Sequence, residues 1–67
     1  MKIEVGKKYK TRDGRDVLVF RKTHDCIEGR IKIERGFTEM DWDIDGESIG
    51  EERDSNLDLI SEVKDVD

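Results

Sequence analysis

CIEGRIKIERGFTEMDWDI, residues 26–44, is the stretch of this chain with the strictest two-residue alternation. In its first half, small or apolar residues alternate with charged ones: Ile27, Gly29, Ile31 and Ile33 against Glu28, Arg30, Lys32 and Glu34. Because successive side chains of a β-strand point to opposite faces, this spacing predicts a strand with one apolar face.

A second alternating run follows the turn signal Arg35-Gly36. One of its faces carries Thr38, Met40, Trp42 and Ile44, and the other carries Glu39, Asp41, Asp43 and Asp45. The two runs together predict an antiparallel hairpin with one apolar face. This composition favours a small β domain that binds a partner over one that catalyses a reaction.

The size and composition of the chain indicate one small domain, residues 1–67, with a thin core. Sixty-seven residues lie near the lower limit at which one core offsets chain entropy. Only 33% of the residues are hydrophobic and 46% are charged, but the apolar residues are periodic, which favours folding. Self-association would extend so small a core, and we therefore expect a homo-oligomer.

Other bulk features indicate a cytoplasmic protein. One cysteine cannot form a disulfide within the chain, and the N-terminus has no apolar run of signal-peptide length. No stretch has the apolar length of a membrane span, so we expect no membrane association.

The net charge of −5 conceals two halves of opposite sign. Residues 1–36 carry eleven Lys or Arg and six Asp or Glu, a net +5, whereas residues 37–67 carry two against twelve, a net −10. Such a split predicts either cross-strand ion pairs or two surfaces of opposite charge.

The dipeptide Asp13-Gly14 is the clearest turn signal. It is typical of a two-residue hairpin turn, in which both central residues need positive φ. The expected strands are Lys8–Arg12 and Arg15–Lys22.

The second of these strands is apolar on both sides. Val17 and Val19 point one way, and Leu18 and Phe20 point the other. That pattern is typical of a central strand or of one curled inside a small barrel. The fold class is therefore predicted as all-β, a small antiparallel sheet or SH3-like barrel of about five strands.

The last third of the chain predicts a mobile loop, a closing strand and a frayed tail. Residues 46–56 hold turn formers, charges and a single apolar residue, Ile49. The segment 57–61 alternates briefly and is expected to be the last strand, with a helix capped by Ser55 as the alternative. Residues 62–67 are expected to fray.

Two sets of residues invite chemical interpretations that we do not favour. Asp41, Asp43, Asp45, Gly46 and Glu52 match the spacing of a calcium-binding loop, but that loop lies between helices and this one follows a predicted strand. His24 and Cys26 are too few for a zinc site, and we expect a core cysteine and a loop histidine. We expect no enzyme activity, no cofactor and no metal site.

A cationic surface beside an aromatic ring is the favoured site. Its expected cations are Lys10, Arg12, Arg15, Arg30 and Lys32, and its expected stacking ring is Tyr9 or Trp42. Cations meet phosphate groups and a ring stacks on a base, so the pattern suggests a nucleotide or oligonucleotide. The alternative for Trp42 is that it is simply the largest residue of the core.

Several short features of the chain resemble those of small, mostly uncharacterised proteins of tailed bacteriophages. These features are Tyr9 to Val17, the isolated Gly29, Trp42, Asp45-Gly46 and Leu57-Asp58-Leu59. The resemblance implies a compact β fold of the counter-defence type, acting in the host cytoplasm. It implies no particular site residue.

Two functions follow as hypotheses. The first is a non-enzymatic binder of an anionic small molecule, a nucleotide signal of host defence. The second is an acidic inhibitor that binds a host protein by imitating nucleic acid phosphates. A calcium-binding loop protein is a third possibility. We do not expect stable binding to duplex DNA.

Overall fold

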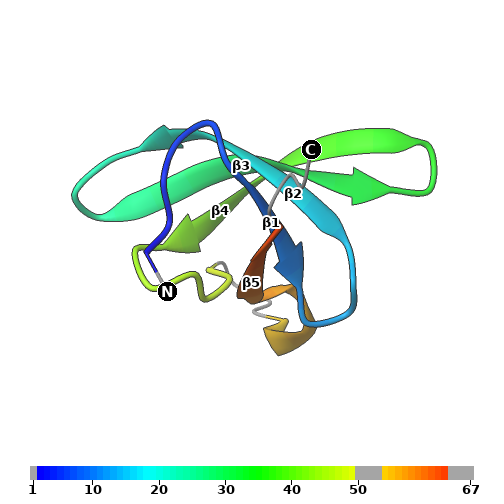
Figure 1. Cartoon of the computed structure of the whole chain (residues 1–67). Coiled ribbons are helices and arrows are strands. Elements are labelled where there is room, and N and C mark those ends of the chain that lie inside the picture. Colours follow the sequence, from blue (N-terminus) through cyan, green and yellow to red (C-terminus); the bar gives the residue numbers. More distant parts are fainter. Residues whose placement is uncertain (1, 50–53, 64–67) are drawn as a thin grey trace.

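A computed structural model describes residues 2–49 and 54–63 of the chain (Figure 1). Its strands are β1 (Lys8–Thr11), β2 (Asp16–Lys22), β3 (Cys26–Ile33), β4 (Gly36–Asp43) and β5 (Leu59–Val63). One 3-10 turn, η1 (Ser55–Leu57), precedes β5, and the described residues form no α-helix. The prediction of a small all-β fold with about five strands is confirmed. The closing strand expected at residues 57–61 is present but begins at Leu59, because Leu57 ends the 3-10 turn.

The strands form one antiparallel sheet in the order β4-β3-β2-β1-β5. The first four strands are a meander, and β5 joins β1 at the far edge from β4. Because β4 and β5 are the two edges and do not pair with each other, the sheet is open. Of the two predicted forms, the structure has the antiparallel sheet and not the SH3-like barrel. Figure 1 shows the β2–β3 and β3–β4 turns at opposite ends of the strongly twisted molecule.

The β3–β4 hairpin has the register that the alternation predicts. Ile27 lies opposite Trp42 and Ile31 opposite Thr38, so the apolar residues of both strands share the face that we call the inner face. The opposite side of the sheet is the outer face. Ile44 is an exception to the prediction, because it lies in the turn beyond β4 and is 45% exposed.

The core lies against the inner face. Its buried apolar residues are Ile3, Tyr9, Val17, Val19, Ile27, Ile31, Trp42 and Leu59. The chain before β1 and the chain after β4 meet beside this core: a Cβ atom at Gly46 would lie 2.8 Å from Ile3 Cδ1. The backbone N–H of Leu59 also donates to the carbonyl of Gly46 at 2.8 Å. Two connecting segments thus complete a core that the open sheet alone leaves uncovered.

Part of the loop predicted as mobile, residues 46–56, is tied to this core. Ser48 is buried, forms an isolated bridge with Trp42, and its backbone N–H donates to Asp58 Oδ1 at 2.9 Å. The Ser48 hydroxyl donates to the carbonyl of Asp54 at 2.7 Å. Residues 50–53 lie outside the described part of the chain.

The C-terminal prediction needs a similar correction. Residues 62 and 63, expected to belong to the frayed tail 62–67, are the end of β5 and pair with β1. Residues 64–67 lie outside the described ranges.

The first hairpin differs from its prediction in the length of the turn. The N–H of Gly14 donates to the carbonyl of Thr11, and the N–H of Thr11 donates to the carbonyl of Arg15, both at 3.0 Å. Within this loop only Gly14 has positive φ, at 88°. This is a three-residue loop closed by a left-handed glycine, so Asp13 does not need the positive φ that a two-residue turn demands. The Thr11 hydroxyl bonds both the Asp13 carboxylate and the Arg15 N–H, which favours this longer loop.

Candidate functional site

Tyr9 and Trp42, the two rings predicted to stack on a ligand, are both buried. Each has 0% of its surface exposed. Tyr9 Oη accepts a hydrogen bond from the N–H of Glu4 at 2.7 Å, and Trp42 Nε1 donates to the carbonyl of Leu57 at 2.8 Å. Because each ring packs in the core and has its polar atom satisfied by the backbone, neither offers a face to a ligand. The alternative interpretation of Trp42, as the largest core residue, is confirmed.

Three of the predicted cations form contacts near the turn of the first hairpin. Lys10 Nζ lies 2.7 Å from Asp16 Oδ1, and Arg15 Nε lies 3.0 Å from Asp13 Oδ2. Arg12 Nε donates to the carbonyl of Ser55 at 3.2 Å. These cations already have partners, so binding a phosphate there would first break an existing contact.

The carboxylates of this hairpin are held in their charged form. A hydrogen bond from the Thr11 hydroxyl, helped by Arg15, lowers the pKa of Asp13, and a hydrogen bond from Lys10 lowers the pKa of Asp16. The cations Lys10 and Arg15 therefore stabilise their own turn.

Arg30 and Lys32, the other two predicted cations, lie on the outer face of β3. The Arg30 guanidinium lies over the ring of Phe20, with its Cζ 5.9 Å from the ring centroid, and Lys32 Nζ lies 4.9 Å from the centroid of Phe37. Within the described ranges neither cation forms a salt bridge. The positive charge of both is therefore open to an anion that approaches the outer face.

The predicted single cationic patch is only partly formed. Arg15 reaches Lys32, because its Nη1 donates to the carbonyl of that residue at 3.2 Å. Arg12 points the other way, toward η1, where its Nη2 lies 3.9 Å from Asp58 Oδ2. The structure thus groups Arg30 and Lys32 with Arg15 nearby, and it separates them from Arg12.

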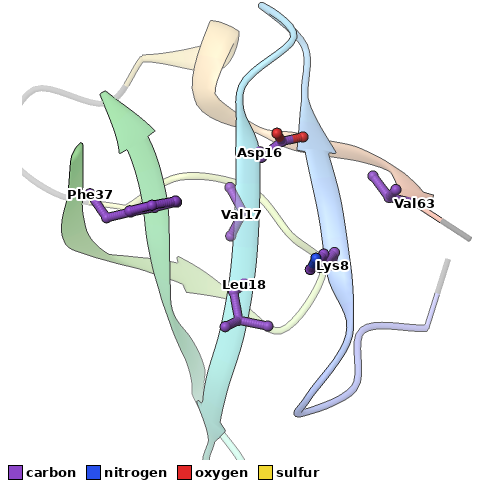
Figure 2. A pocket seen from close by; sticks show the side chains of 6 residues that line it. All are labelled: Lys8, Asp16, Val17, Leu18, Phe37 and Val63. Atoms are coloured by element: carbon purple, nitrogen blue, oxygen red, sulfur yellow. The ribbon is translucent and has the colours of Figure 1, made fainter. Parts of the chain in front are cut away.

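The outer face also exposes apolar side chains where two strands would ordinarily carry polar ones. Leu18, Phe20 and Phe37 are 38%, 41% and 58% exposed. A hollow of about 280 Å³ adjoins two of them, and its lining residues are Lys8, Asp16, Val17, Leu18, Phe37 and Val63. Figure 2 shows that these residues come from β1, β2, β4 and β5. A second hollow of about 240 Å³ is lined by Arg30, Phe37, Thr38 and Glu39. Phe37 lines both hollows, which makes it the central residue of this surface.

Phe20 and Phe37 were not among the predicted site residues, although the sequence carries a signal for one of them. The apolar residues on both sides of β2 correctly indicate a central strand, since β2 is third of five. Their second side faces outward because the sheet stays open and no barrel wall covers it. Phe37 follows the turn glycine and is an apolar residue on the otherwise charged side of β4. The sequence does not show that it lies beside a cation, because that depends on the register, which pairs Phe37 with Lys32.

Several carboxylates of the acidic half that lie in the described ranges are engaged in local contacts. Asp43 Oδ1 accepts from the N–H groups of Asp45 and Glu47, and Asp54 caps η1 by accepting from the N–H of Asn56. Asp58 is buried, at 7% exposure. These carboxylates stabilise turns and one buried contact, so fewer of them are available to imitate a row of phosphates.

The chemical sites that the sequence suggested receive no geometric support. Asp41 and Asp43 lie in the β4 ladder opposite Glu28 and Cys26, so they are extended and not wrapped as a calcium loop requires. Glu52 lies outside the described residues. His24 is in the exposed β2–β3 turn beside Asp25, and Cys26 is half-buried with its Sγ 3.4 Å from the Thr23 hydroxyl. In residues 2–49 and 54–63 no three His, Cys, Asp or Glu side chains gather as metal ligands would.

Comparison of the chain with models of protein families, with curated proteins and with solved structures found no match. The described segments also hold no helix of the length and apolar character that crossing a membrane requires.

The exposed rings, the two hollows and the nearby cations together make the outer face around Phe37 the candidate site. Its cations are Arg30, Lys32 and Lys8.

Proposed function

We propose that this protein is a non-enzymatic binder of a nucleotide, which it holds on the outer face around Phe37. The observation that carries the proposal is the half-exposed Phe37 ring, which lines a mainly apolar hollow and lies beside Lys32, a cation that forms no salt bridge in the described part of the chain. The base would stack on the ring, and the phosphate would meet Lys32 and Arg30. The resemblance to phage proteins would make the ligand a host signal that is held and not turned over.

The energetics of the two contacts favour such a ligand. Stacking of a base on an aromatic side chain contributes about 1–3 kcal/mol. Lys32 and Arg30 lie over ring faces and form no salt bridge within the described ranges, although Lys32 also interacts electrostatically with Asp16. An exposed cation–π contact is worth only about 0.5–1 kcal/mol. A phosphate therefore gains a charge-assisted hydrogen bond at little cost in existing contacts.

The size of the hollow limits what it can enclose. Its volume, about 280 Å³, lies just below the roughly 300–1,000 Å³ of pockets that enclose drug-sized ligands. A single flat ring fits such a space, with the sugar and phosphate on the open surface. The proposal thus concerns recognition of one base and its phosphate, without enclosure of the whole ligand.

Thermal shift and calorimetry with mononucleotides, cyclic dinucleotides and short linear oligonucleotides test the proposal. A bound nucleotide raises the Tm by mass action. Phe37→Ala should weaken binding about tenfold or more, because the stacking surface is lost, and Lys32→Glu should weaken it at least as much.

Two matched variants control for general effects of these substitutions. Val5→Ala removes an apolar side chain of similar exposure, 53%, outside the outer face, and Lys2→Glu reverses a charge that is 81% exposed. Both should bind as the wild type does. No Tm change with any nucleotide, together with salt-sensitive capture of a host protein, would replace this proposal by the acidic-inhibitor hypothesis.

A further inference from the structure

We infer that the outer face carries a second base-stacking subsite, formed by Phe20 and Arg30, and that the ligand is a short linear single strand of nucleotides. The inference rests on the proposed function, which it extends from one base to several. Its basis is that two ring–cation pairs, and not one, lie on the same face of the sheet.

The first step is that Phe20 lies on the outer face, which it shares with Leu18 through the alternation of β2, and that it lies at an irregularity of the ladder. The β2–β3 register shifts between Val19 and Arg21, so Phe20 is the extra residue of a β-bulge. A bulge redirects side chains relative to a regular ladder, and bulges are common next to functional sites. Phe20 is 41% exposed, and the Arg30 guanidinium lies over its ring.

The second step concerns the chemistry of this pair. A guanidinium is planar, so one of its faces can rest on a ring while the other accepts a base. The neighbouring carboxylate, Glu28, is paired with Arg21 at 3.3 Å, which reduces its repulsion of a phosphate. The subsite therefore has a flat cationic surface next to a neutralised acid.

The third step is the connection between the two subsites. Phe20 lies on β2 and Phe37 on β4, with β3 between them. Arg30 links them, because it lies over Phe20 and also lines the hollow that Phe37 lines. Arg30 and Lys32, two residues apart on one side of β3, thus form a row of positive charge along which a phosphate backbone can run.

The fourth step estimates the length of strand that fits. Two strand spacings separate β2 from β4, about 10 Å, and the offset along β3 from Lys32 to the level of Phe20 is about 11 Å. The subsites are then roughly 15 Å apart, farther than one nucleotide reaches, whereas a strand of about four nucleotides spans them.

The same surface sets an upper limit on the length of strand that gains affinity. Glu39 lies opposite Arg30 on edge strand β4, and Asp41 follows it on the same exposed side. Glu39 also lines the second hollow with Arg30 and Phe37, so the bound phosphates must lie on the β3 side of its carboxylate. A longer strand that extends past β4 would pass both carboxylates and be repelled. Affinity should therefore rise with length up to about four nucleotides and then stay constant.

Calorimetric titration of the full chain with thymidylate and adenylate strands of one to twelve nucleotides tests this inference. We expect affinity to rise at least tenfold between the mononucleotide and the tetranucleotide of the better series, with no further rise beyond it. Phe20→Ala should abolish the rise and weaken mononucleotide binding much less than Phe37→Ala does, because it removes the ring under Arg30 but not the stacking ring. Arg30→Lys, which keeps the charge and loses the planar group, should reduce the rise, and Phe37→Ala should weaken both ligands.

Folding of each variant is checked by the fluorescence of Trp42, the only tryptophan, which is buried beneath the opposite face. If mononucleotides bind and depend on Phe37, but affinity does not rise with length or Phe20→Ala changes nothing, the second subsite is overturned and the proposed function stands. A cyclic dinucleotide bound as tightly as the tetranucleotide would overturn the inference that the ligand is a linear strand. If no strand and no mononucleotide binds, both proposals fail.

Discussion

Gly29 is the residue that admits the largest side chain of the protein into the core. A Cβ atom at this position would lie 3.1 Å from Trp42 Cζ3 and 3.0 Å from the carbonyl oxygen of Leu18. The ladder pairs Gly29 with Met40, two residues before Trp42 on the same face, so the indole leans diagonally across the glycine. The strand alternation places a glycine on the apolar face, but this diagonal contact depends on sheet twist, which a sequence does not display.

Gly29→Ala should therefore lower the free energy of unfolding by about 1–3 kcal/mol, because the added methyl forces Trp42 or the β2 backbone to move. Urea unfolding followed by Trp42 fluorescence measures the change. Ser61→Ala, at an exposed position of β5, is the control and should stay within about 0.5 kcal/mol of the wild type. Equal midpoints for Gly29→Ala and wild type would refute the close contact.

Tyr9 provides a second test at the residue scale, because its predicted and observed roles differ. Tyr9→Phe removes the acceptor of the Glu4 N–H and should cost about 0.5–1.5 kcal/mol of stability. It should leave nucleotide affinity unchanged, since the ring is buried below the inner face. Paired urea and calorimetric titrations separate the two effects. Weaker binding with unchanged stability would restore the stacking role that the sequence suggested.

Among the elements, β3 and β4 were the most predictable and the first turn the least. The strict alternation of this segment predicts which side of each strand is apolar, and the structure agrees for residues 26–43. Asp13-Gly14 is ambiguous, because an Asp-Gly pair suits a two-residue turn and also the end of a three-residue loop. Here the side-chain hydroxyl of Thr11 selects the longer loop through contacts that the strand pattern does not encode.

The lowered pKa values of three carboxylates predict how stability changes with pH. The pKa values of Asp13 and Asp16 are lowered from the ordinary 3.8, and that of Glu4 from 4.5, chiefly by hydrogen bonds from Thr11, Lys10 and Lys7 respectively. A lowered pKa in the folded state means that the stabilisation is complete above the ordinary value and is lost as pH falls through the lowered one. The Tm should therefore drop as pH decreases below about 4.5.

Asp13→Asn should make that acid-side drop shallower, and thermal unfolding between pH 7 and pH 2.5 measures it. Added salt should weaken the pH dependence of the wild type, because these contacts are exposed and screened. An acid profile of Asp13→Asn that coincides with that of the wild type would show that the turn does not hold its carboxylate in the charged form.

For the whole molecule, the open sheet explains why the predicted site moved. The sequence correctly indicates that Arg30 and Lys32 lie on the charged side of β3, opposite Glu39 and Phe37. It does not show whether β4 and β5 close on each other, and that decides whether Leu18 and Phe20 lie inside a barrel or face solvent. Tyr9 and Trp42 are aromatic residues on apolar faces, so composition alone cannot distinguish a core ring from a ligand platform.

Self-association, expected from the small core, stays a prediction at this scale. The outer face exposes Leu18, Phe20 and Phe37 together, so a second copy could bury apolar area there, in competition with a nucleotide on the same face. Sedimentation velocity over a range of concentrations should show a larger species that Phe37→Asp disrupts. A monomer at all concentrations would contradict the expectation.

Chemical-shift mapping tests the central claim most directly, because it reports where on the sheet a nucleotide binds. Backbone amide spectra are recorded with increasing amounts of the tightest nucleotide found by thermal shift. The largest changes should fall on Leu18, Arg30, Lys32 and Phe37 of the outer face. Changes centred on Arg12 and Asp13 in the first turn, with the β3 and β4 amides unmoved, would contradict it.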